Sequence, residues 1–206
     1  MNSVALTLGR SPRIICHMRV LPLPDRKYRK EFVIEEDPSK ARKVREDITT
    51  YDILYFIECL GKDRDVHYSD NGAPDVAYRN DPQPDRLVKD EKTGRQIAIE
   101  HAELHESQEY VEKLNYEIEK YWWTSGPPPS PHELAARLLQ MIDEKKSKRQ
   151  FTNYPDSERI ILFRDRCTSG TTKDFLECAK YLALPDNPGC DHCYVLLSSG
   201  AVLEVV

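Results

Sequence analysis

Two acidic residues in one short segment constrain the fold of this chain most. Residues 83–103 form a pattern typical of two strands joined by a tight turn, with Asp85 near the start and Glu100 near the end. A loop at residues 91–94 sets Asp85 opposite Glu100. Opposed residues have Cβ atoms roughly 5 Å apart on one face of a sheet. Like charges that close destabilise a hairpin unless a cation lies between them, so the segment predicts a metal site and points towards phosphodiester chemistry.

The composition allows one large domain with a very polar surface. The chain has 206 residues, of which 39% are hydrophobic and 32% charged, and its formal net charge is −5. This charge does not favour a bulk electrostatic binder of nucleic acid. Basic residues nevertheless cluster at 13–30, 40–45 and 145–149. Each cluster is a candidate for phosphate contacts, with solvated surface as the competing interpretation.

Neither a membrane segment nor a disulfide framework is expected. No apolar run approaches the ~20 residues that a membrane-spanning helix needs, and the first nine residues lack the form of a secretory signal. The six cysteines are scattered and lie mostly in apolar segments. That pattern is typical of reduced thiols, so we expect a cytoplasmic protein without a membrane partner.

Hydrophobic periodicity predicts an α/β fold with a mixed central β-sheet flanked by helices. We expect a single domain over residues 1–206, with an irregular extension at 1–38, a core at about 39–182 and a closing hairpin at 190–206. The expected elements are short strands at 4–8 and 14–20, a helix at 39–60, a surface loop at 62–83, the hairpin at 84–103, helices at 105–123 and 130–149, a central strand at 158–164 and a helix at 172–182.

The helix predicted at 39–60 brings a third acid towards the sheet. Glu58 stands four residues after Leu54 on an apolar stripe, so its carboxylate is expected to point inward. Gly61 is expected to end the helix. The remaining residues of the stripe are Val44, Ile48, Tyr51 and Tyr55.

The start of the helix at 130–149 has a clear sequence pattern. Ser130 is expected to cap it, with Pro131 at the first position and Glu133 three residues after the cap, which is a capping box. The residues expected to face the core are Leu134, Leu138, Met141 and Ile142.

The acidic hairpin resembles the core of the PD-(D/E)xK nuclease superfamily, which has the restriction-endonuclease-like fold. The resemblance rests on Pro84-Asp85, a strand, a glycine turn and Ile97-Ala-Ile-Glu100, with a helix bearing Glu58 before them. It implies that Asp85, Glu100 and Glu58 are catalytic and hold Mg²⁺ or Mn²⁺, which polarises the scissile phosphate. It further implies a hydrolase that cleaves phosphodiester bonds in nucleic acid, with DNA favoured over RNA as the expected substrate. Whether the chain forms a homodimer stays open.

One position departs from the pattern of that superfamily. Its lysine, two residues after the glutamate, helps to position or deprotonate the attacking water, and Ala102 stands there in this chain. Relatives of the fold include cases in which this lysine has migrated. Ala102 therefore leaves two hypotheses, an active nuclease with a substitute group and an inactive nuclease-fold domain that binds nucleic acid or protein. The candidate substitutes are Lys89, His101, Glu103, His105, Lys145 and Lys146.

Each acid also has a purely structural interpretation. Asp85 follows a proline and could cap a turn, Glu100 could pair with an arginine, and Glu58 could lean out to solvent from the end of its helix. Coordinates in which the acids of the hairpin diverge, or in which one arginine neutralises both, contradict the metal site.

Two other motifs have competing interpretations. Cys190-Asp-His-Cys193 has the spacing of half a zinc site, but no second half follows in the sequence. Packing is the favoured role for these thiols, and a redox role is less favoured because the motif does not open a helix. Trp122-Trp123 could stack on bases, with packing again favoured.

Overall fold

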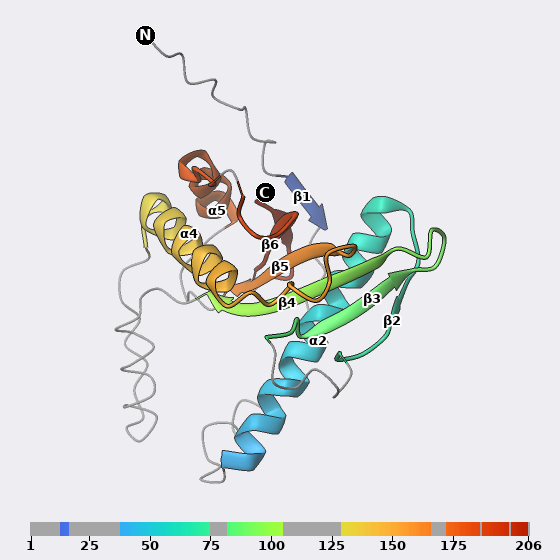
Figure 1. Cartoon of the computed structure of the whole chain (residues 1–206). Coiled ribbons are helices and arrows are strands. Elements are labelled where there is room, and N and C mark those ends of the chain that lie inside the picture. The colour runs from blue at the N-terminus through green and yellow to red at the C-terminus, as the bar shows by residue number, and fades with distance from the viewer. Residues whose placement is uncertain are drawn as a thin grey trace.

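The computed structural model describes residues 13–16, 38–74, 82–104, 129–165, 172–185, 187–197 and 199–205. They form an α/β structure in which helices cover both faces of a mixed β-sheet (Figure 1). The predicted strand at 4–8, the predicted helix at 105–123, His105 and Trp122-Trp123 lie outside the described residues. No helix in the described part is both long and apolar enough to cross a membrane.

Seven strands are hydrogen-bonded in the order β1-β7-β6-β5-β4-β3-β2. β4 and β5, and likewise β5 and β6, run parallel, whereas all other neighbours are antiparallel. The predicted mixed sheet is thus confirmed, and so is the central place of the strand at 158–164. The strands are β1 (Arg13–Cys16), β2 (Tyr68–Asp70), β3 (Arg86–Asp90), β4 (Gln96–Leu104), β5 (Glu158–Asp165), β6 (His192–Leu196) and β7 (Val202–Glu204).

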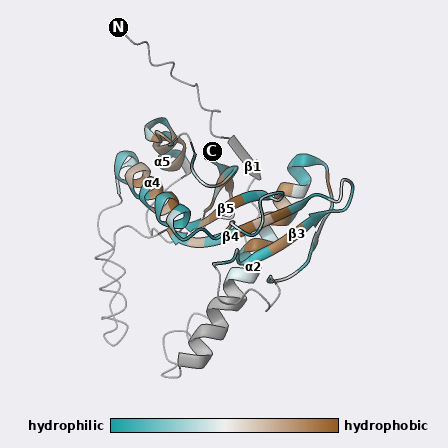
Figure 2. Cartoon of the chain, viewed as in Figure 1, coloured by the Kyte–Doolittle hydropathy of each residue, from teal (hydrophilic) through white to brown (hydrophobic). Residues whose placement is uncertain are grey.

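The helices divide the core into two layers. The long helix α2 (Pro38–Arg64) packs on one face of the sheet, and α4 (Pro131–Ser147) packs on the other with α5 (Thr172–Cys178) and the short 3₁₀ helix η2 (Ala179–Tyr181). Figure 1 shows α2 on the side of the sheet away from α4 and α5. Hydrophobic residues are concentrated along β4 and β5 in Figure 2, as expected for strands covered on both faces.

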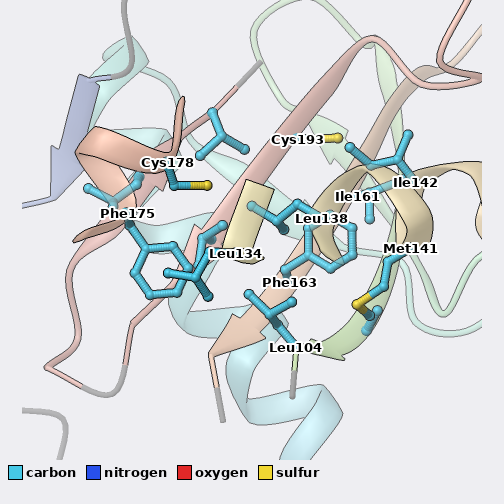
Figure 3. Close-up of a cluster of buried hydrophobic side chains, with 14 of the residues drawn as sticks. Leu104, Leu134, Leu138, Met141, Ile142, Ile161, Phe163, Phe175, Cys178 and Cys193 are labelled. Atoms are coloured by element: carbon cyan, nitrogen blue, oxygen red, sulfur yellow. The ribbon is translucent and has the colours of Figure 1, made fainter. Parts of the chain in front are cut away.

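Side chains of the central strands alternate between these layers. Ile97 and Ile99 of β4 pack with α2, whereas Ala98 and Ala102 pack with α4. This alternation is the ordinary period of a strand. Figure 3 shows the layer beneath α4, where Leu134, Leu138, Met141 and Ile142 meet Ile161 and Phe163 of β5.

Predictions from local pattern are confirmed for α4 and the last hairpin. Ser130 accepts a hydrogen bond from the backbone N–H of Glu133, and the Glu133 side chain accepts one from the backbone N–H of Ser130. The four apolar residues predicted to face inward are all buried. β6 and β7 pair antiparallel, as predicted for the closing hairpin at 190–206.

Helix α2 differs from the prediction in its buried face and in its end. Leu54 is 42% exposed, and Gly61 lies inside the helix, which continues to Arg64. Asp65 ends it with a φ of 53°. The sequence admits two apolar stripes, and the sheet selects the one whose apolar residues carry no tyrosine hydroxyl group. The residues that α2 buries against the sheet include Ile53, Phe56, Ile57 and Leu60.

The surface loop predicted at 62–83 contains a strand. β2 pairs antiparallel with β3, so the hairpin is not the edge of the sheet. A two-point ion pair reinforces this pairing, since Arg86 donates through Nε and Nη2 to the two carboxylate oxygens of Asp70 at 3.0 and 2.7 Å. Three residues are too few to produce a strand pattern in the sequence.

Replacing Gly61 with alanine is expected to destabilise the protein, although alanine favours helices. A Cβ atom at position 61 would lie 2.7 Å from the backbone oxygen of Val66, which cannot rotate away. We expect a loss of about 1–3 kcal/mol in the free energy of unfolding, typical of overpacking, measured by chemical denaturation. If helix propensity dominated instead, Gly61→Ala would stabilise the protein by up to about 1 kcal/mol.

Candidate functional site

The hairpin has the register that its sequence predicts. Arg86 pairs with Ile99, so Asp85 and Glu100 are the next opposed positions. At the turn, the Asp90 N–H donates to the Arg95 carbonyl at 2.9 Å. Asp85 lies just before β3, and its Oδ2 accepts the backbone N–H of His101 at 2.8 Å. The structure thus holds the Asp85 carboxylate against β4, one residue from Glu100.

Glu100 points into the layer beneath α4 and is almost completely enclosed. Its side chain is 3% exposed. Oε1 accepts hydrogen bonds from Nζ of Lys145 and, at 2.7 Å, from Nε2 of Gln150. Oε2 is also buried and has no hydrogen-bond partner among the described residues. One oxygen of this carboxylate is therefore held in place, and the other stays available to a ligand.

Lys145 of α4 contacts the Glu100 carboxylate. Ala102 lies on the same face of β4 as Glu100, but it packs in the hydrophobic core. Lys145 reaches Glu100 instead from the last turn of α4, and it also lies 3.5 Å from the carbonyl oxygen of His101. Lys146 points elsewhere and donates to the carbonyl of Asn187. Of the three lysines among the candidate substitutes, the structure brings Lys145 into contact with Glu100.

Burial and like charge set the electrostatics of the pair. The pKa of Glu100 is raised to about 7, chiefly by burial and next by the charge of Asp85, while Lys145 and Gln150 act in the opposite direction. No arginine of the described residues is seen to bridge the two acids, and Arg86, the nearest in sequence, pairs with Asp70 and Thr50. The acids repel each other across a site that a cation would stabilise.

The structure does not bring Glu58 to this pair. Glu58 belongs to α2, which packs on the face of the sheet opposite to Glu100. Its side chain is 51% exposed and forms an ion pair with Lys62 one turn along the helix. The prediction of an inward carboxylate was wrong because it assumed the stripe of Leu54, whereas α2 buries Ile53, Phe56, Ile57 and Leu60.

A second buried network lies behind the pair, on the side of α2. His101 points to the face opposite Glu100, as strand alternation predicts, and its Nε2 lies 3.2 Å from Oδ2 of Asp52. Oδ1 of Asp52 is 3.7 Å from Nη1 of Arg164. Since Asp85 binds the backbone N–H of His101, this network supports the same point of β4 from behind.

Sequence reasoning missed Asp52 and Gln150. Asp52 precedes Ile53 on the buried face of α2, and an acid amid buried apolar residues signals an internal partner. Gln150 follows a turn at the end of α4 in which Arg149 has a φ of 55°. No local pattern identifies that turn as one that directs a side chain to Glu100. Two other candidate substitutes, Lys89 and Glu103, are exposed.

The residues present fit a hard divalent cation. No group of three or more histidine, cysteine, aspartate or glutamate side chains suited to a metal occurs among the described residues. Mg²⁺, however, is commonly bound through one or two carboxylates and keeps several waters. Asp85 and Glu100 supply two carboxylates, and the unpartnered Oε2 of Glu100 is a buried acceptor that a cation would satisfy.

The chain is without a match in all three comparisons: no family model, no curated protein and no solved structure is similar to it. The interpretation of the site therefore rests on its geometry.

Burial of Glu100 predicts a pH-dependent stability. The pKa of Glu100 rises from 4.5 to about 7 on folding, so between these values the native state binds more protons than the unfolded state. Its contribution therefore favours folding below pH 4.5 and is lost as the pH rises towards 7. We expect wild type to lose up to roughly 3 kcal/mol relative to Glu100→Gln across this window, measured by urea unfolding with a chelator present. Parallel curves for the two proteins would contradict this.

Two further variants separate the causes of that shift. Asp85→Asn removes the repelling charge, so the pH-dependent loss should move to lower pH. Lys145→Met removes the attracting charge, so the loss should extend to higher pH. The same unfolding series measures both. Shifts in the same direction for both variants would show that neither charge governs the pKa of Glu100.

Proposed function

We propose that this chain is a metal-dependent nuclease of the restriction-endonuclease-like fold. It hydrolyses phosphodiester bonds in nucleic acid, and DNA is favoured over RNA as the substrate. The observation that carries the proposal is the contact of Lys145 with Glu100, beside Asp85. It supplies a lysine for the position that Ala102 leaves without one. Two acids and a lysine then meet at one end of the hairpin, as in the superfamily that the hairpin resembles.

Asp85 and Glu100 are the residues that would hold Mg²⁺ or Mn²⁺. When bound, such an ion supplies Lewis-acid activation of the phosphoryl oxygen. The protein contributes a buried carboxylate, since Gln150 and Lys145 fix one oxygen of Glu100 and leave the other for the ion. Preorganised charge of this kind acts more strongly in a low-dielectric site than in water.

Lys145 has the role of the electrophilic group. Its ammonium stays close to Glu100 and carries the positive charge that would stabilise the negative charge developing on the phosphate. Its side chain is 16% exposed, so it is not sealed from a substrate. The residue is held by the last turn of α4, which fixes its direction better than a loop would.

The end of α4 also supports a nucleic-acid substrate. Lys148 and Arg149 are exposed in the turn between Lys145 and Gln150. Two cations next to a phosphodiesterase site are suited to the neighbouring phosphates of a backbone. Binding through them is independent of base sequence, so the proposal makes no statement about sequence preference.

The main test is cleavage of plasmid, single-stranded DNA and RNA by the purified chain, with Mg²⁺, Mn²⁺ or chelator. We expect cleavage that needs the divalent ion. Asp85→Asn, Glu100→Gln and Lys145→Met should each lower the rate at least about 100-fold, because each removes a group that stabilises the transition state.

Two matched variants control for loss of charge alone. Lys146→Met removes the adjacent lysine, and Glu58→Gln removes the acid on the opposite face of the sheet. Both should retain cleavage close to wild type. An equal loss in Lys146→Met and Lys145→Met would remove the specific role of Lys145, and full activity of both Asp85→Asn and Glu100→Gln would exclude the proposed site.

Metal binding is measured separately from catalysis. An ion that binds only the native state stabilises it by about 2.7 kcal/mol at a hundred times its Kd. We expect Mn²⁺ or Mg²⁺ to raise the Tm of wild type in a concentration-dependent way and to raise that of Glu100→Gln much less. A rise in Tm without cleavage of any substrate would favour the second hypothesis, an inactive nuclease-fold domain that keeps its metal and its binding surface.

A further inference from the structure

Two cysteines lie side by side where β6 begins. The Sγ atoms of Cys190 and Cys193 are 3.5 Å apart, and neither cysteine is in a disulfide. Cys190 lies in the loop before the strand and is 5% exposed, whereas Cys193 is completely buried. Asp191 between them is exposed, so the outer end of the pair lies near the surface.

The loop before Cys190 turns the chain back towards the strand. Gly189 has a φ of +82°, and a Cβ atom there would lie 3.1 Å from Cγ of Lys146. The Gly189 N–H donates to the side chain of Asn187 at 3.0 Å, and the carbonyl of Asn187 accepts from Lys146. The loop is thus fitted against α4 in a conformation that favours glycine and leaves Cys190 over Cys193.

Hydrogen bonding and charge distinguish the two thiols. The pKa of Cys190 is lowered, chiefly by its contact with the sulfur of Cys193 and also by the nearby guanidinium of Arg159, against the opposing effects of burial and Asp191. The pKa of Cys193 is raised by the same contact and by its complete burial. Cys190 is therefore deprotonated more readily than Cys193, and Cys190 is the thiol expected to attack first.

The surroundings favour a dithiol over a metal ligand set. A structural zinc site needs four ligands, and no group of three suitable side chains occurs within the described ranges. The third buried cysteine of this layer, Cys178, lies beside Phe175 and away from Cys193 (Figure 3). The motif does not open a helix, as redox Cys-x-x-Cys motifs do. The two sulfur atoms are nevertheless in direct contact, which is what disulfide formation requires.

We propose that Cys190 and Cys193 are a redox-active dithiol, which exchange with a small-molecule disulfide of the glutathione type converts to an intramolecular disulfide. The Cys190 thiolate attacks one sulfur of the small disulfide, forms a mixed disulfide and releases one thiolate. Cys193 then loses its proton and attacks the sulfur of Cys190, which releases the second thiolate. The protein loses two electrons and two protons, and one small disulfide becomes two thiols.

The dithiol does not depend on the proposed nuclease activity. Its loop nevertheless contacts Lys146, the residue after Lys145. The dithiol therefore lies next to the end of α4 that carries Lys145 of the candidate site.

The test is oxidation of the folded, full-length chain. Reduced protein is incubated with glutathione disulfide and a chelator, the remaining thiols are alkylated after denaturation, and the peptides are mapped by mass spectrometry. We expect the peptide with Cys190 and Cys193 to lose the mass of two hydrogen atoms and to escape alkylation, while Cys178 stays alkylated. Persistent alkylation of both cysteines, or a disulfide from either of them to another cysteine, would overturn the proposal.

Single variants test the order of the two steps. Cys193→Ser removes the second thiol, so it should accumulate one glutathione on Cys190. Cys190→Ser should accumulate none on Cys193, because that sulfur is buried. Cys178→Ser is the matched control and should oxidise at the 190–193 pair like wild type. Accumulation on Cys193 but not on Cys190 would reverse the assignment, and the wild-type map decides the proposal where a variant fails to fold.

Discussion

The buried contact between Glu100 and Lys145 is the interaction on which the candidate site depends. A carboxylate that is 3% exposed is costly to ionise, and a second acid nearby makes it more so. Lys145 and Gln150 offset only part of that cost, because both bind the same oxygen. The proposed metal site rests on the remaining oxygen, which is a buried acceptor without a hydrogen-bond partner among the described residues.

Residues on both faces of the sheet hold the candidate site in place. On the α4 side, the capped helix and its apolar residues bring Lys145 onto β4. On the α2 side, Asp52 binds the ring of His101, whose backbone N–H holds Asp85. Precise sites commonly need such second contacts, because a side chain that binds a ligand is held only as firmly as the residues that contact it.

Some misplaced predictions share one cause. Glu58 and Leu54 were assigned to the buried side of α2 from spacing alone, but a helix with apolar residues on adjacent stripes can turn either one inward. Only the shape of the sheet face, with Ile99 of β4 and Tyr194 of β6, decides between them. Gly61 has a different cause, since the close approach of the Val66 backbone needs a residue without a side chain at that position of the helix.

The sequence alone determined what depends on near neighbours in the chain. The register that opposes Asp85 and Glu100 follows from the loop length, the start of α4 from its capping box, and the mixed α/β class from the alternation of patterns. The tertiary structure alone decided which lysine reaches Glu100, which acid faces inward from α2 and that two cysteine sulfurs meet. Short-range geometry limits the first set to a few outcomes, whereas contacts such as that of Lys145, forty-five positions from its partner, depend on how whole elements pack.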